Sequence, residues 1–329
     1  MKHWPIYILL TTFLLTACER EIDYAGEIEK PKLVLHAEVG EGDTVVQCFV
    51  SRSIFFFEER TYDWDEYLMP DAVTQLQRGE QDWQTMTWSD KEKSFVLPLA
   101  TPLKAGETIR LRASYPDYET VTAQQTVVNK PFMQILPDYW RNPVKHYFEI
   151  SVILTAYPPD VDVVLGFSAE CRFNIFTKKG NQTVVSRGMS TRIMSDDAIF
   201  ASAGNAYSTE LRYNSRHELF FKPGYEHAKI VELHIPYQSP DEGDDREKEI
   251  IVTELNLHFH AHSRDSYLYW TSIYAAFGKG GEEDFDLGRE VGSMFGTEED
   301  VQIYSNINGG YGMFAATSQY TVNKKNIKF

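Results

Sequence analysis

The stretch KLVLHAEVGEGDTVVQCFVS, residues 32–51, contains two runs in which apolar and polar residues alternate. Alternation with a period of two is the pattern of a β-strand that buries one face. The Gly-Glu-Gly-Asp sequence at 40–43 separates the two runs and is typical of a turn. We therefore predict that the folded part of the chain begins with two strands joined by a turn.

Similar alternating runs continue as far as residue 130, separated by Gly, Pro and Asp residues, at 72–77, 94–99, 107–114 and 118–128. About seven short strands in about 95 residues is the pattern of an immunoglobulin-like β-sandwich. We predict such a sandwich over residues 32–130, and we expect Asn129-Lys130-Pro131 to end it. Within it, Lys104-Ala105-Gly106 predicts a tight hairpin turn.

Residues 131–329 are also rich in strand patterns, the clearest at 147–157, 165–176, 229–235 and 249–261. We expect a second β-rich domain here, either a sandwich or a barrel-like sheet. Asn308-Gly309-Gly310 predicts a hairpin between 302–307 and 311–318, because Asn and Gly adopt positive φ at little cost. The fold class predicted for the whole chain is mainly β.

One main helix is predicted near residues 264–277. Ser263 is a plausible N-cap, and Asp265 lies in the first turn, where the helix dipole favours an acid. Four aromatic residues recur at helical spacing, namely Tyr267, Trp270, Tyr274 and Phe277. A stripe of this kind usually packs on the core, although it can also serve as a ligand platform.

The N-terminal residues predict a lipoprotein signal peptide. A short basic start precedes an apolar run of about a dozen residues, too short to span a bilayer. The order Leu15-Thr16-Ala17-Cys18 is similar to a bacterial lipobox, in which the thiol is acylated and the chain is cut before it. We predict a signal peptide at 1–17, a lipid anchor on Cys18 and an acidic tether at 18–31. The alternative is an ordinary signal with a chance cysteine.

The charge of the chain argues against some partners. The formal net charge is −16, and phosphate backbones or anionic headgroups repel such a surface. We therefore expect no binding to nucleic acid. Cys48 and Cys171 lie on apolar stretches far apart in sequence, so two buried thiols are favoured over a disulfide.

An aromatic and acidic segment at 54–70 lies between predicted strands and is expected to form a surface loop. Aromatic side chains on a loop stack on sugars or anchor peptides. The candidate contact residues for a ligand or partner are Phe56, Tyr62, Trp64 and Tyr67. In the competing interpretation, the Phe residues at 55–57 finish a strand and cover the sandwich end.

The run LNLHFHAHS, residues 255–263, contains His258, His260 and His262. Strand alternation places the three imidazoles on one face. Residues two apart on a strand are about 7 Å apart, so at most two of the three can share one ion, with other ligands from another strand. The sequence does not decide whether His258 and His260 bind metal. The favoured interpretation is that the three are partly exposed histidines of a strand.

Catalytic motifs are nearly absent from the sequence. It contains no phosphate loop, dinucleotide-binding glycine motif or nucleophile elbow, and His217-Glu218 lacks the second histidine of a zinc-protease helix. A pair of catalytic acids for glycoside hydrolysis stays an alternative, because the sequence does not show the distance between two carboxyl groups in the folded chain. We assign no catalytic residue, no cofactor and no metal ligand, and we expect the chain not to be an enzyme.

A series of structural motifs along the chain resembles a known family. The motifs are Cys18-Glu19, KLVL at 32–35, Gly42-Asp43, Val50-Ser51-Arg52-Ser53, Asp71-Ala72-Val73, AGETIRLRA at 105–113, DYETVTA at 117–123, YLYW at 267–270 and SNINGGYGMF at 305–314. Their order is similar to that of a family of Bacteroidota outer-membrane lipoproteins, domain of unknown function 4249. The match spans nearly the whole mature chain.

The resemblance implies a lipoprotein exposed at the cell surface. It implies an accessory binding or assembly subunit of a TonB-dependent uptake complex for peptides or glycans, next to a transporter and its lid lipoprotein. Two alternatives are a surface-anchored hydrolase of the imported material and a free-standing adhesin or ligand-binding lipoprotein. The motifs are turns, strand starts and a helix, so they imply no catalytic role.

Overall fold

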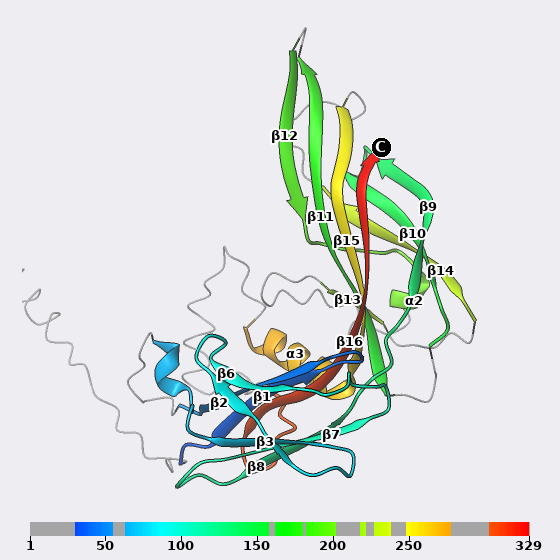
Figure 1. The fold of residues 1–329 in the computed structure, drawn as a ribbon. Helices are drawn as coiled ribbons and strands as arrows, with labels where there is room; N and C mark the ends of the chain where they lie inside the picture. Colours follow the sequence, from blue (N-terminus) through cyan, green and yellow to red (C-terminus); the bar gives the residue numbers. More distant parts are fainter. Residues whose placement is uncertain are drawn as a thin grey trace, which may run out of the picture.

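The computed structural model describes residues 30–54, 63–157, 162–179, 182–201, 218–221, 227–237, 248–277 and 303–328 (Figure 1). The predicted signal peptide, Cys18 and nearly all of the predicted tether lie outside these residues, as do Phe56 and Tyr62. The described chain consists mainly of strands, so the predicted mainly β class is confirmed.

The first sandwich lies at the bottom of Figure 1 and has two sheets. One sheet contains β1 (Leu33–Val39), β2 (Val45–Arg52), β6 (Ser94–Pro98) and β5 (Thr87–Ser89). The facing sheet contains β4 (Gln84–Thr85), β3 (Val73–Arg78), β7 (Thr108–Ser114) and β8 (Val121–Thr126). Leu35, Leu76 and Leu111 are fully buried in the core, so the alternation in the sequence identified the inward-facing positions.

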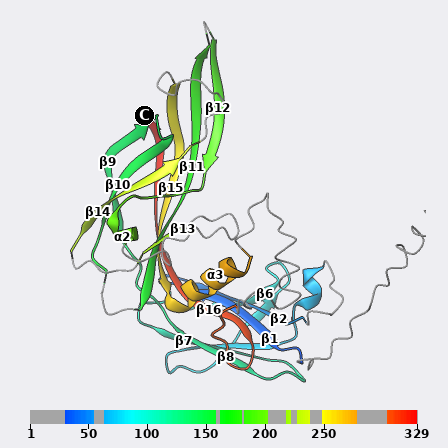
Figure 2. The same ribbon diagram turned by 180° about the vertical axis from the view of Figure 1, so that it is seen from behind.

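Helix α3 (Arg264–Phe277) lies on the other face of β1 and β16 (Figure 2). Ser263 is its N-cap, since the Ser263 Oγ accepts a hydrogen bond from the backbone N–H of Ser266 at 3.3 Å. Tyr267 is buried against Phe220, with ring centroids 5.3 Å apart. The predicted helix is confirmed, and Tyr267 packs as a core residue.

A single long sheet connects the two ends of the molecule. Its order is β12-β11-β15-β16-β1-β2-β6-β5, and β13 also pairs with β11. The new strands are β11 (Val163–Lys179), β12 (Gln182–Ser190), β13 (Glu218–Phe221), β15 (Lys248–Ser263) and β16 (Tyr311–Lys328). β16 pairs in parallel with β1 at its start and antiparallel with β15 over the rest of its length (Figure 1).

A second sandwich forms where a sheet of three strands packs on the upper half of the long sheet (Figure 1). These strands are β9 (Met133–Asn142), β10 (Tyr147–Leu154) and β14 (Lys229–Pro236). Phe148 on β10 contacts Phe173 on β11, with ring centroids 5.7 Å apart. The sheets that the structure describes are open, so the second half is a sandwich. Two short helices complete the described elements, η1 (Trp64–Tyr67) and α2 (Ala198–Ala201).

The predicted domain boundary at 130/131 stays a prediction. β16 lies at the far end of the chain, yet residues 311–316 pair with β1 of the first sandwich. The first sandwich therefore contains a strand from each end of the described chain.

Two predicted hairpins are wrong. The Lys104-Ala105-Gly106 turn exists, with the Glu107 N–H bonded to the Lys104 carbonyl at 3.1 Å, but β6 and β7 on its two sides belong to different sheets. Residues 303–307 form no strand beside β16. Instead, the Asn306 side chain donates to the Phe314 carbonyl at 2.7 Å and accepts from its N–H at 2.9 Å, in place of a backbone partner.

Cys48 and Cys171 are both free and buried, as predicted. Burial raises the pKa of each thiol to about 12, so the thiolate is nearly absent at pH 8. We expect neither thiol to react with a disulfide reagent such as DTNB in the folded Cys18→Ser variant, and both to react in denaturant. Rapid release of one equivalent of chromophore from the folded protein would contradict this.

Candidate functional site

The three histidines of β15 lie on one face of the strand, as predicted. The ring centroids of His258 and His260 are 6.0 Å apart, and those of His260 and His262 are 5.4 Å apart. His258 is half-buried, whereas His260 and His262 are 7% and 6% exposed. The expectation of partly exposed histidines therefore holds for His258 and is wrong for the other two, because the Glu218 side chain lies against both rings and Ser266 of α3 lies against His262.

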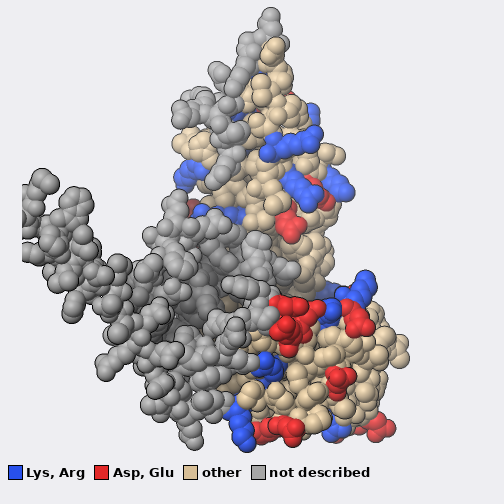
Figure 3. Space-filling model, turned by 90° about the vertical axis from the view of Figure 1, so that its left-hand side faces the viewer, with Lys and Arg blue, Asp and Glu red and all other residues tan. Residues whose placement is uncertain are grey.

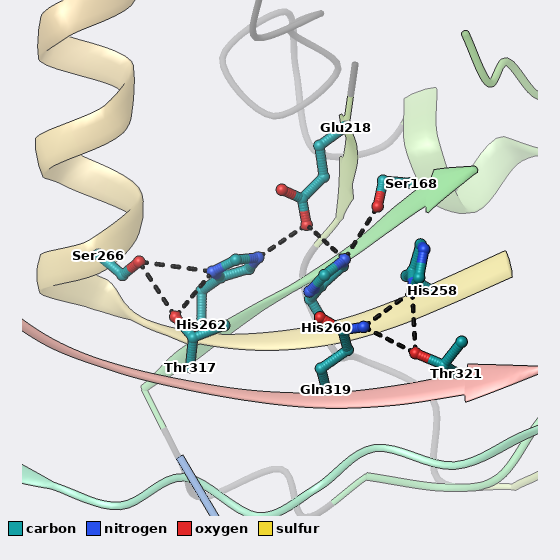
Figure 4. A network of polar contacts seen from close by, with 9 residues as sticks. All are labelled: Ser168, Glu218, His258, His260, His262, Ser266, Thr317, Gln319 and Thr321. Atoms are coloured by element: carbon teal, nitrogen blue, oxygen red, sulfur yellow. Dashed lines mark hydrogen bonds and ion pairs between the residues drawn. The ribbon is translucent and has the colours of Figure 1, made fainter. Parts of the chain in front are cut away.

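His258 is held by the neighbouring strand β16. Its Nδ1 lies 2.9 Å from the Thr321 hydroxyl and 2.8 Å from the Gln319 amide nitrogen. These contacts turn the ring toward β16 (Figure 4). These two contacts attach His258 to β16.

His260 and His262 share the carboxylate of Glu218, which comes from β13. The Glu218 Oε1 lies 2.7 Å from the His262 Nε2 and 3.9 Å from the His260 Nε2 (Figure 4). One donor atom from each of the three residues lies within 4.8 Å of the others. We call Glu218, His260 and His262 the histidine cluster.

Glycine at position 166 makes room for this arrangement. β11 lies between β13 and β15, with Gly166 opposite His260 and Ser168 opposite both His258 and Glu218. The Glu218 side chain must therefore cross β11 to reach the imidazoles. A Cβ on residue 166 would lie 2.4 Å from the Glu218 Oε1, closer than atoms approach, so any larger side chain here displaces the carboxylate.

The far side of His262 is anchored at the start of α3. Its Nδ1 lies 3.2 Å from the Thr317 hydroxyl and 3.4 Å from the Ser266 hydroxyl. Burial lowers the pKa of His262, but the charge of Glu218 and its hydrogen bond outweigh burial, so the pKa is raised above 6.5. The ring is therefore fixed with its Nε2 directed at the carboxylate.

The cluster opens into a cavity of about 670 Å³ between the first sandwich and the start of α3, which we call the junction cleft. Besides the cluster, its charged lining consists of Glu38, Glu41, Asp43 and Lys130. Burial raises the pKa of Asp43. Four carboxyl groups against one lysine favour a cation in this cleft.

A second group of candidate ligands lies in the other sandwich and contains Glu149, Glu232 and His234. The His234 Nε2 lies 3.5 Å from the Glu149 Oε2, and its ring stacks on Tyr147 with centroids 4.3 Å apart. Only one imidazole is present in this group, and Glu232 is exposed. It is typical of a buried histidine paired with an acid.

Of the four predicted aromatic contact residues, the structure describes the side chain of Tyr67 alone. Tyr67 is 4% exposed, and the Arg52 guanidinium lies 5.2 Å from the centre of its ring. The prediction that Tyr67 is a surface contact is therefore wrong, because the end of η1 folds it onto the sandwich. Trp64 begins the same short helix, and the assignments of Phe56, Tyr62 and Trp64 stay predictions.

The sequence did not indicate that Glu218 lies beside the histidines. The run ELFF at 218–221 is too short to predict a strand, and nothing near it in sequence indicates that it pairs with β11. The histidine alternation did indicate that another strand must supply the remaining ligand. That partner strand became visible only in the folded chain.

A comparison with models of protein families shows which family the chain belongs to. The model of the family described as "Domain of unknown function (DUF4249)" matches residues 18–323. The chain belongs to this family. The resemblance drawn from the motifs is therefore confirmed, and the match includes the whole histidine cluster.

Other comparisons add little about this family member. No curated protein matches it. A solved structure titled "Enterococcal surface protein, partial N-terminal region" is 4% identical with a TM-score of 0.16, covering 75% of this chain and 94% of that one. Another, "Biofilm associated protein - BSP domain", is 5% identical with a TM-score of 0.17, covering 73% of this chain and 58% of that one. At these TM-scores neither match supports a conclusion about function.

Proposed function

We propose that this chain is a surface-exposed lipoprotein that acts as a binding and assembly subunit of a TonB-dependent uptake complex. In this proposal Cys18 carries the lipid, and the acidic tether at 18–31 spaces the first sandwich from the membrane. The cargo is a peptide or a glycan, and the partners are a transporter and its lid lipoprotein. The protein captures cargo and performs no reaction of its own.

The observation that carries the proposal is the junction cleft. Its volume of about 670 Å³ lies within the range of about 300–1,000 Å³ that is usual for ligand sites. Its lining combines charged side chains with the half-buried Trp270 and the hydroxyls of Thr317 and Ser318. Polar groups beside an aromatic ring are suited to peptides and sugars.

The surface charge gives further support. On the face in Figure 3, Asp and Glu side chains lie mainly on the first sandwich, whereas Lys and Arg side chains lie on both sandwiches. An uneven charge distribution orients a protein against a charged partner. α3 has 14 residues, and no described helix has the length and apolarity needed to cross a bilayer.

We expect Cys18→Ala to release the protein from the membrane fraction, because each buried lipid methylene contributes about 0.8 kcal/mol of anchoring. The measurement is immunoblotting of membrane and soluble fractions after a carbonate wash. Cys48→Ala is the control, since it removes a buried thiol and should leave the protein in the membrane. A Cys18→Ala protein that stays in the washed pellet would show that lipid on this residue is not the anchor.

The choice among the functions depends on what the native protein retains after solubilisation of the outer membrane in detergent. An assembly subunit co-purifies with a transporter even without cargo. A free-standing binder purifies without a transporter and still binds peptide or glycan. An enzyme converts the peptide or glycan to product. Recovery without any transporter would contradict the assembly part of the proposal, and product release would contradict the binding part.

A further inference from the structure

We infer that Glu218, His260 and His262 bind one divalent transition-metal ion, for which Zn²⁺ is the best chemical match. The inference concerns the histidine cluster alone. It holds whether or not the chain is lipidated and whether or not it joins a transporter.

The spacing of the donor atoms matches a metal site. A tetrahedral ion with bonds of about 2.1 Å places its ligand atoms about 3.4 Å apart. The Glu218 Oε1 lies 2.7 Å from one imidazole nitrogen and 3.9 Å from the other, and all three donors lie within 4.8 Å. These distances bracket the required value, so small side-chain rotations bring all three to an ion.

The chain also holds the donors in place, as metal sites require. A metal-binding imidazole usually has its second nitrogen fixed by a hydrogen bond. The His262 Nδ1 has two such hydroxyls, from Thr317 and Ser266, while its Nε2 points at Glu218. Gly166 leaves the space through which the carboxylate reaches both rings.

The burial of the donors distinguishes this cluster from a chance surface group. The side chains of Glu218, His260 and His262 are 13%, 9% and 8% exposed. Without an ion, the Glu218 carboxylate pairs more closely with His262 than with His260. The Nε2 of His260 lies 3.0 Å from the Ser168 hydroxyl. A divalent cation satisfies the carboxylate and both imidazoles at once.

The donor set selects the kind of ion. Two imidazoles and one carboxylate suit Zn²⁺ and its transition-metal neighbours, whereas Mg²⁺ and Ca²⁺ take oxygen ligands. Three protein ligands leave a fourth position, and the cluster lines the junction cleft. The fourth ligand is then water or a donor that enters from the cleft. The acidic lining raises the local concentration of cations.

The test uses the full mature protein in detergent, purified with a tag that contains no histidine and freed of metal by a chelator. Isothermal titration with ZnCl₂ is expected to show one ion per chain, undisturbed by excess Mg²⁺. His262→Gln and Glu218→Gln are each expected to weaken binding at least about 100-fold. Gly166→Ala keeps every donor but displaces the carboxylate, so it should weaken binding as well.

Two variants are matched controls. His258→Gln removes a histidine from the same face of β15, and His234→Gln removes the imidazole of the second cluster. Both should bind Zn²⁺ with unchanged affinity and stoichiometry. Circular dichroism checks that each variant is folded.

X-ray absorption at the zinc edge decides the matter without any variant. The expected result for the wild-type protein with one equivalent of Zn²⁺ is a shell of nitrogen and oxygen at about 2.0–2.1 Å with two imidazoles. A stoichiometry far below one, unchanged affinity in folded His262→Gln, loss of binding in His234→Gln, or a spectrum without imidazole would each overturn the inference.

Discussion

Replacing Gly312 by alanine is expected to destabilise the fold by about 4 kcal/mol. Gly312 has φ +109°, a conformation that residues with a side chain rarely adopt. A Cβ at this position would lie 2.1 Å from the Leu35 carbonyl oxygen on β1. Since Leu35 and Gly312 pair in register, the added atom forces the two strands apart.

Gly106→Ala is the matched control. Gly106 also has positive φ, at +80°, but no atom lies within 4 Å of the position of its Cβ. It is expected to cost only the backbone strain, about 1–2 kcal/mol. The measurement is urea denaturation of both variants followed by tryptophan fluorescence. Equal losses of unfolding free energy would show that contact with β1 contributes nothing.

Arg78→Met is expected to destabilise the first sandwich by about 2 kcal/mol. The buried Arg78 guanidinium donates to both oxygens of Glu107, at 2.7 and 2.8 Å, and to the Thr101 carbonyl at 2.8 Å. Methionine fills a similar volume but leaves the carboxylate and the carbonyl without these donors. The loss should appear in denaturation at pH 7.

The effect of Arg78→Met should depend on pH in a definite direction. Hydrogen bonding by Arg78 lowers the pKa of Glu107 below 4.5 in the folded chain. A lowered pKa contributes stability above pH 4.5, and this contribution is lost as the pH falls through the folded-state pKa. The difference between wild type and variant should therefore shrink in acid. A difference that is constant down to pH 3 would contradict this account.

Glu80→Gln is the control for Arg78→Met. The Glu80 carboxylate lies 3.5 Å from the Arg110 guanidinium, but its side chain is 92% exposed. Water screens such a pair, so the change should cost less than about 0.5 kcal/mol.

The strands could be predicted where alternation is clear. Residues 33–39, 108–114 and 121–126 form strands close to the predicted runs, because burial of one face imposes a period of two. The second half of β16 was missed, since TVNKKNIK at 321–328 is polar and mostly exposed. Edge and exposed strands are set by their neighbours, which the local pattern does not identify.

Pairing was harder to predict than strands. The turn residues at 104–106 and 308–310 indicated reversals correctly, but a turn does not determine whether the next strand joins the same sheet. The histidine face followed from alternation, whereas Glu218 lies 42 positions before His260 and reaches it across β11. Long-range proximity of this kind depends on sheet order, which one sequence does not contain.

The parallel pairing of β1 with β16 affects the order of folding. Val34 lies opposite Tyr311, so nearly the entire chain separates the two partners. Contacts this distant in sequence form late. Until residues 311–316 are in place, this edge of β1 lacks its β16 partner, so a C-terminally truncated chain is expected to be prone to aggregation.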